Sequence, residues 1–157
     1  MDIQKDQNQD LIKRVVELSA PVARVWRALT DHAEFGAWFR VKLDGPFVVG
    51  EVTRGNITYP GHEHMEWESL TEVLEHERRF VFSWPPSAID PETAYSDDAK
   101  VVVEFVLESI GDERTRLTIT ESGFVQFPES KRAGVLQSCA EGWGIQAQNI
   151  AEYLDRS

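Results

Sequence analysis

The stretch Ser130–Leu154, with the sequence SKRAGVLQSCAEGWGIQAQNIAEYL, decides the fold that we expect for this chain. Its apolar residues recur at a helical spacing, which predicts one long amphipathic helix with a single buried stripe. The residues of that stripe are Leu136, Ala140, Trp143, Ala147, Ile150 and Leu154. Much of the chain before it alternates with a period of two, which is typical of strands. The simplest architecture is therefore an α+β domain in which a curved antiparallel sheet wraps around this helix.

The chain before this helix predicts one strand, two short helices and then a run of strands. The first strand is Leu11–Leu18, and Pro21 is suited to the first turn of the helix that follows. Asp31, with Glu34 three residues later, resembles a capping box at the start of the second helix. The strands expected after the helices are Phe47–Val49, Glu51–Thr53, Ile57–Tyr59, His64–Leu74, Phe80–Trp84, Lys100–Ile110 and Thr115–Glu121. The turn signals between the early strands are Gly50, Gly55-Asn56 and Pro60-Gly61.

The remaining segments are expected to be irregular. Residues 1–10 are almost entirely polar and predict a flexible tail, which leaves residues 11–157 as a single domain. Residues 85–99 hold three prolines and several aspartates, which indicates a long loop. A loop of that length in a compact domain is often functional or disordered.

Charge and cysteine content exclude several classes of protein. The chain has 157 residues and a formal net charge of −11, with no basic run. Because phosphate backbones are bound through Lys and Arg, we expect neither nucleic acid nor an anionic membrane as a partner. A single cysteine, Cys139, excludes an intramolecular disulfide and is typical of a reducing compartment. We see no signal peptide and no long apolar run, so the expected location is the cytoplasm.

The order of the elements and several short motifs resemble a known superfamily. These motifs are Ala20–Val22, Gly45–Phe47, Arg79–Trp84, Thr115–Phe124 and Gly142-Trp143. From about Leu11 to Leu154 the chain resembles the helix-grip fold of the START/birch-pollen-allergen (SRPBCC) superfamily. Within that superfamily it is most similar to AHSA-type proteins, relatives of the C-terminal domain of the activator of the heat-shock-protein ATPase. The loop at residues 85–99 departs from the compact pattern of that family.

The resemblance implies a pocket between the sheet and the final helix, with no cofactor. The aromatic supply of five Trp and eight Phe favours a small hydrophobic or aromatic ligand there. The candidates for the pocket wall are Trp38, Phe39, Phe82, Trp84, Phe105, Phe124 and Trp143. The alternative for each is ordinary core packing. Tyr59, Gln146 and Cys139 are further candidates for ligand contact, and bare backbone at Gly142 and Gly144 beside Trp143 fits either close packing or a ligand.

Glu121 is the polar residue of most interest. It continues the face of Leu117 and Ile119, so the period of two points it into the apolar interior. A carboxylate there could orient a ligand hydroxyl or amine, or act as a catalytic acid or base with a raised pKa. The alternative is a strand-end residue that turns to water or pairs with an Arg. Burial beside a second polar group in a cavity would favour catalysis, whereas exposure at a rim would favour binding or no role.

Other functions stay open at this stage. Family relatives include enzymes, so a cyclase, dehydratase or hydrolase is an alternative to simple binding. A second alternative is a chaperone partner, although 157 residues leave no room for the activator's N-terminal domain. His62 and His64 share a face of an expected strand and are candidate metal ligands. Tyr59 and Trp67 are candidates for a homodimer patch, because edge strands need cover.

Overall fold

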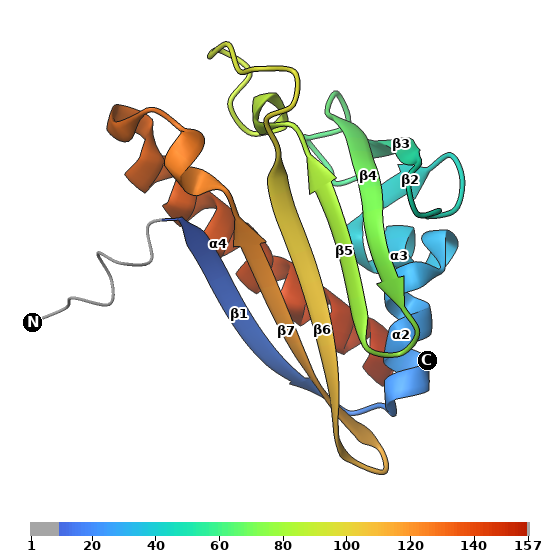
Figure 1. The fold of residues 1–157 in the computed structure, drawn as a ribbon. Helices are drawn as coiled ribbons and strands as arrows, with labels where there is room; N and C mark the ends of the chain where they lie inside the picture. The colour runs from blue at the N-terminus through green and yellow to red at the C-terminus, as the bar shows by residue number, and fades with distance from the viewer. Residues whose placement is uncertain (1–9, 157) are drawn as a thin grey trace, which may run out of the picture.

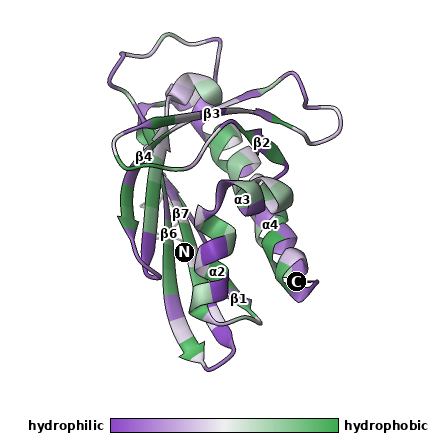
Figure 2. Cartoon of the chain, turned by 90° about the vertical axis from the view of Figure 1, so that its right-hand side faces the viewer, coloured by the Kyte–Doolittle hydropathy of each residue, from purple (hydrophilic) through white to green (hydrophobic). Residues whose placement is uncertain are grey.

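The computed structural model describes residues 10–156, which form a seven-stranded antiparallel sheet with three α-helices on one face (Figures 1 and 2). This confirms the predicted α+β helix-grip architecture. The strand order is β1-β7-β6-β5-β4-β3-β2, so β1 and β2 are the two edges. Of the predicted tail, residues 1–9 lie outside the described residues. The backbone carbonyl of Asp10 accepts hydrogen bonds from the amides of Gly123 and Phe124.

The strands are β1 (Leu11–Leu18), β2 (Val41–Leu43), β3 (Val52–Ile57), β4 (Glu66–Glu75), β5 (Arg79–Trp84), β6 (Val101–Gly111) and β7 (Arg114–Ser122). The helices are α2 (Val22–Thr30), α3 (His32–Phe39) and α4 (Glu129–Asp155), with two short 3-10 turns, η1 (Pro86–Ala88) and η2 (Phe124–Gln126). Within residues 10–156, no helix combines the length and apolar character needed to cross a membrane.

The predicted cap at Asp31 begins α3. The Asp31 carboxylate accepts hydrogen bonds from the backbone N–H groups of Ala33 and Glu34, at 3.0 and 3.1 Å. It thereby satisfies two of the amide groups that the first turn of a helix leaves without partners. The helix ends at Arg40, which adopts a left-handed conformation with φ of 71°. Because α3 stops here, Phe39 lies in its last turn and faces α4.

The long helix α4 divides into two halves. The stripe residues of its second half, Trp143, Ala147, Ile150 and Leu154, are buried. They pack with the inward-facing row of β7 and β6, in which Leu117, Ile119 and Phe105 are almost fully buried. In the first half, Leu136 and Ala140 are only partly buried. There the helix covers a smaller apolar cluster built around Val101, Phe124 and Phe127.

The region from Val41 to Met65 differs from the sequence prediction. The short strand β2 was not predicted, and the predicted strand Phe47–Val49 is irregular. The predicted turn at Gly55-Asn56 is wrong, because β3 runs straight through it. At Gly55 a Cβ atom would lie 2.2 Å from the Lys42 carbonyl oxygen. Glycine is therefore needed there so that the backbone of β2 can approach closely, rather than to turn the chain.

The structure also places the candidate metal ligands and the residues of the predicted dimer patch differently from the sequence prediction. His62 and His64 lie in a turn before β4, where the Tyr59 carbonyl accepts from the amide of His62. They therefore do not share a strand face. Trp67 is buried in the core and donates its indole N–H to the Ser69 hydroxyl at 2.9 Å, so it cannot form a surface patch with Tyr59.

Candidate functional site

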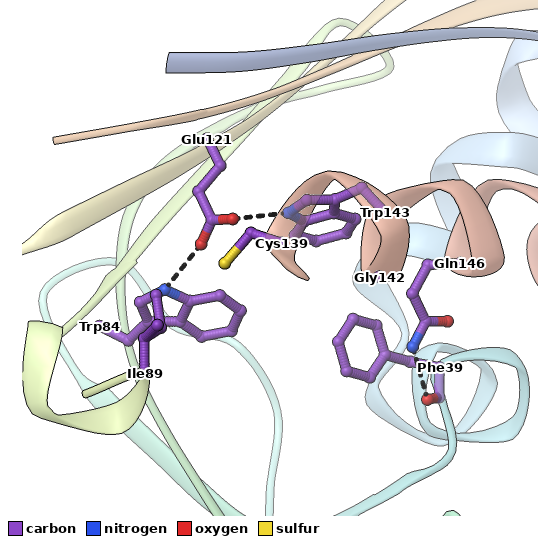
Figure 3. Close-up of a pocket in the computed structure, with 8 residues that line it drawn as sticks. All are labelled: Phe39, Trp84, Ile89, Glu121, Cys139, Gly142, Trp143 and Gln146. Carbon is purple, nitrogen blue, oxygen red and sulfur yellow. Dashed lines mark hydrogen bonds between the residues drawn. The ribbon is translucent and has the colours of Figure 1, made fainter. Parts of the chain in front are cut away.

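A pocket of about 170 Å³ lies between the middle of α4 and the ends of β5 and β7 (Figure 3). The residues that line it are Phe39, Trp84, Ile89, Glu121, Cys139, Gly142, Trp143 and Gln146. They come from five parts of the chain: the end of α3, the end of β5, the loop after η1, the end of β7 and the middle of α4. The pocket therefore forms only when the fold brings these five segments together.

Glu121 provides the carboxylate of this pocket. It is 1% exposed, and the alternation of β7 points it inward, as the sequence predicted. Its Oε1 accepts a hydrogen bond from the indole N–H of Trp143 at 2.8 Å. Its Oε2 accepts one from the indole N–H of Trp84 at 3.1 Å. Figure 3 shows the carboxylate between the two indole nitrogens, which come from opposite walls.

The apolar surroundings change the acidity of two groups. Burial raises the pKa of Glu121 to about 6, although hydrogen bonds from Trp143, Trp84 and Cys139 act in the opposite direction. Burial and the neighbouring Glu121 carboxylate raise the pKa of the Cys139 thiol to about 12. Since a thiolate is the reactive form of cysteine, Cys139 is not an activated nucleophile. Its thiol instead lies beside the Glu121 carboxylate in the pocket and helps to lower the pKa of that group.

Contacts among the lining residues hold the other walls of the pocket in place. The ring of Phe39 meets that of Trp143 edge to face, with centroids 6.0 Å apart. Gln146 donates a hydrogen bond to the Phe39 carbonyl oxygen at 3.1 Å and accepts one from Asn149 at 3.1 Å. These bonds join the end of α3 to α4, so the Gln146 amide is already engaged. At Gly142 a Cβ atom would meet nothing within 4 Å, which leaves the pocket open along the helix backbone.

The loop after β5 reaches the pocket through Ile89, and a polar cluster of Asp90, Thr93, Tyr95 and Lys131 holds it against α4. Asp90 accepts hydrogen bonds from the Tyr95 hydroxyl at 2.7 Å and the Lys131 ammonium at 3.1 Å. Lys131 also donates to the Thr93 hydroxyl at 2.8 Å. Hydrogen bonds from Thr93, Tyr95 and Lys131 lower the pKa of Asp90 to about 2. Asp90 therefore stays charged, and the loop is anchored beside the pocket.

Comparison with known proteins identifies the family. The family model described as "Activator of Hsp90 ATPase homolog 1-like protein" matches residues 19–155. The chain belongs to this family. The match confirms the AHSA-type resemblance seen in the sequence. A search of curated proteins returned no match.

Three solved structures illustrate how widely this fold is shared. Protein MLL2253 from Mesorhizobium loti is 24% identical, with a TM-score of 0.68, and the match covers 93% of this chain and 98% of that one. DynU16, a protein in the dynemicin biosynthetic locus, is 23% identical with a TM-score of 0.63, over 90% of this chain and 47% of that one. The Aha1 dimer from Colwellia psychrerythraea is 14% identical with a TM-score of 0.67, over 92% and 95%. At these identities the similarity concerns the fold.

In this member of the activator-like family, the structure brings together only part of the predicted site. The predicted residues that line the pocket are Phe39, Trp84, Glu121, Cys139, Trp143 and Gln146. Trp38 instead donates its indole N–H to the Ala28 carbonyl at 2.8 Å within the core. Phe82 and Phe105 are fully buried in the main core, and Phe124 belongs to the second apolar cluster. Tyr59 is 40% exposed, and its ring lies beside the Arg40 guanidinium.

Two further features complete the site. Ile89 was not predicted, and its only sequence signal is an isolated large apolar residue within a loop rich in proline and acidic residues. Gly142 was noted for its bare backbone, and it lines the pocket. Among residues 10–156 there is no group of three or more His, Cys, Asp or Glu side chains placed to hold a metal ion.

Proposed function

We propose that this protein binds a small apolar ligand, about the size of one aromatic ring, in the pocket beside Glu121. The observation that carries the proposal is a set of apolar walls, Phe39, Trp84 and Trp143, around a single buried carboxylate. Pockets for small molecules are typically apolar with a few placed polar groups that fix orientation.

The size of the pocket limits the ligand. An engineered apolar cavity of about 150 Å³ binds benzene, and the volume here is about 170 Å³. A second pocket, of about 160 Å³, shares the lining residues Phe39, Trp84 and Ile89 with this one. DynU16, which shares the fold, belongs to a biosynthetic locus, and this context is compatible with a small organic ligand.

A matched pair of glycine substitutions tests the proposal. Gly142 and Gly134 both lie in α4, and at both a Cβ atom would meet nothing within 4 Å, but only Gly142 lines this pocket. Replacing either by leucine should improve helix propensity by about 1 kcal/mol or less. We expect Gly142→Leu to abolish binding of toluene, followed by calorimetry, while Gly134→Leu binds as the wild type does. Saturable binding that survives Gly142→Leu, or none in the wild type, would refute the proposal.

Acid–base catalysis by Glu121 is a second candidate. A carboxyl group with a pKa of about 6, buried in a pocket beside Cys139, is suited to proton transfer near neutral pH. The burial of Glu121 beside Cys139 is the observation that favours this second candidate. The two functions are separated by incubating the protein with a bound ligand and following the ligand by mass spectrometry. A ligand recovered unchanged after long incubation would eliminate catalysis on it.

Binding to a chaperone is a third candidate, favoured by the family description and by the Aha1 dimer of the same fold. A pull-down with purified Hsp90 tests it directly. Because such a partner would meet the surface, Gly142→Leu should not affect the result. Failure to retain Hsp90 would refute this candidate and would not affect the proposal that the pocket binds a ligand.

A further inference from the structure

We propose that the pocket selects a small aromatic or alkyl amine in its protonated form, with the ammonium group against Glu121 and the apolar body between Trp84, Trp143 and Phe39. This inference rests on the proposed function and names the chemical class of its ligand. The carboxylate, the walls and the charges around the pocket each support it.

The carboxylate of Glu121 is surrounded by neutral donors. Two indole N–H groups and one thiol approach its oxygens. Indole nitrogens can only donate, so they favour the ionised form of the carboxyl group. A carboxylate presents about four lone-pair sites, and the two indole N–H groups occupy two of them, which leaves sites for a ligand. The buried negative charge is therefore hydrogen-bonded without a cation among these partners.

Arg14, a basic residue of the neighbouring strand β1, is engaged elsewhere. Arg14 of β1 passes beneath α4 and donates to the Ala140 carbonyl at 3.0 Å. Its guanidinium also lies close to Gly144, where a Cβ atom would be 3.1 Å from it. Across the sheet the register partners of Glu121 are Ile12 and Val103, which are apolar. A ligand ammonium would thus supply the counter-charge that these elements do not.

The aromatic walls favour the same kind of ligand. The faces of aromatic rings attract cations, and such attraction strengthens when the site is shielded from water. Trp84, Trp143 and Phe39 supply aromatic rings to the pocket, and Figure 3 shows these rings around the space below the carboxylate. An aromatic enclosure with one carboxylate is suited to an ammonium group with a hydrocarbon body.

The charges around the pocket disfavour anions. Among the described residues that line the pocket, Glu121 is the charged one. The adjoining pocket adds Glu66 and Glu68, of which Glu68 is paired with Arg54 at 2.5 Å. The whole chain carries a formal net charge of −11. A carboxylate or phosphate ligand would meet like charge both on approach and at the site.

Three ligands of nearly equal size test the selection: benzylamine, benzyl alcohol and benzoate. We expect benzylamine to bind most tightly at neutral pH, measured by calorimetry and by the fluorescence of the two tryptophans. Glu121→Gln should weaken benzylamine by about tenfold or more, because a hydrogen bond to a charged group is lost, and leave benzyl alcohol little changed. Glu141→Gln removes a charge from an exposed position of the same helix and should change neither.

The outcomes separate the inference from the proposed function. If benzyl alcohol or benzoate binds the wild type as tightly as benzylamine does, the selection for amines is wrong while the pocket remains a binding site. If none of the three binds while toluene does, the inference is wrong and the proposed function stands; if toluene also fails to bind, both are refuted. If all three bind and Gly142→Leu abolishes none of them, binding occurs outside this pocket and the inference is also wrong. The comparison of ligands on the wild type does not depend on whether Glu121→Gln folds.

Discussion

Replacing Glu121 by glutamine should remove part of the pH dependence of folding stability. In the folded chain, burial raises the pKa of Glu121 from 4.5 to about 6. Between these two values the folded state holds a proton that the unfolded state has lost, so stability falls as the pH rises. This carboxyl group therefore imposes no penalty below pH 4.5 and its full penalty above about pH 6.

The size of the effect follows from the pKa difference. A change of one in pKa corresponds to about 1.36 kcal/mol. The rise from 4.5 to about 6 is thus worth about 2 kcal/mol of lost stability at neutral pH. Glutamine does not ionise, so Glu121→Gln does not suffer this loss of stability at neutral pH. Its side-chain oxygen can accept from one indole, but its NH₂ group leaves the other N–H unpaired, which costs about 1–3 kcal/mol at every pH.

The measurement is the free energy of unfolding in urea for wild type and variant, at one pH below 4.5 and one above 6. The difference between the two proteins should change by about 2 kcal/mol across this interval, in favour of the variant at higher pH. Glu34 and Glu72, whose pKa values are lowered, act with the opposite sign but cancel in the comparison. Glu141→Gln is the control. Parallel curves for Glu121→Gln and wild type would mean that the carboxylate is hydrated, and the reasoning would fail.

Three other changes probe the surroundings of the site. Gly55→Ala should lower the free energy of unfolding in urea by about 1–3 kcal/mol or more, because the added Cβ would clash with a backbone carbonyl of β2. Gly45→Ala is the control: its Cβ would meet no atom within 4 Å, so it should not destabilise the protein. The Cys139 thiol, with its pKa raised to about 12, should react slowly with a maleimide in the native state and quickly after unfolding; equal rates would contradict its burial. Asp90→Asn should speed limited proteolysis of the loop after β5, whereas exposed Asp97→Asn should not; unchanged cleavage would show that the loop is held by other contacts.

The fold could be predicted where the local pattern and the tertiary environment agree. The stripe of α4, the alternation of β7 and the cap at Asp31 each reflect a periodicity or a side chain that acts within a few residues. The prediction failed between Val41 and Met65, where short strands carry little pattern. Glycine at position 55 has a local signature of a turn, but the structure uses it for close strand packing. That role depends on β2, which lies more than ten residues earlier in the chain.

The site could be predicted only in its inward-facing residues. Alternation placed Glu121 on the inner face, and helical spacing placed Trp143 opposite it. The sequence could not show that Trp84 donates to the Glu121 carboxylate. Trp84 and Glu121 are 37 residues apart, and their strands β5 and β7 are brought together only because both pair with β6. The sequence also could not distinguish residues that line the pocket from residues buried in the core. Phe82 and Trp84 belong to one strand, yet Phe82 is fully buried and Trp84 lines the pocket.

The two glycines beside Trp143 show why a single sequence signal can have two causes. Both were expected to serve the tryptophan, by close packing or by making room for a ligand. In the structure, a side chain at Gly144 would press against the guanidinium of Arg14, so this glycine allows β1 to pack beneath the helix. A side chain at Gly142 would meet no atom within 4 Å, and the space it would enter is the pocket. Packing therefore explains Gly144 but not Gly142, and the space that Gly142 leaves beside Glu121 is where the amine proposed above would lie.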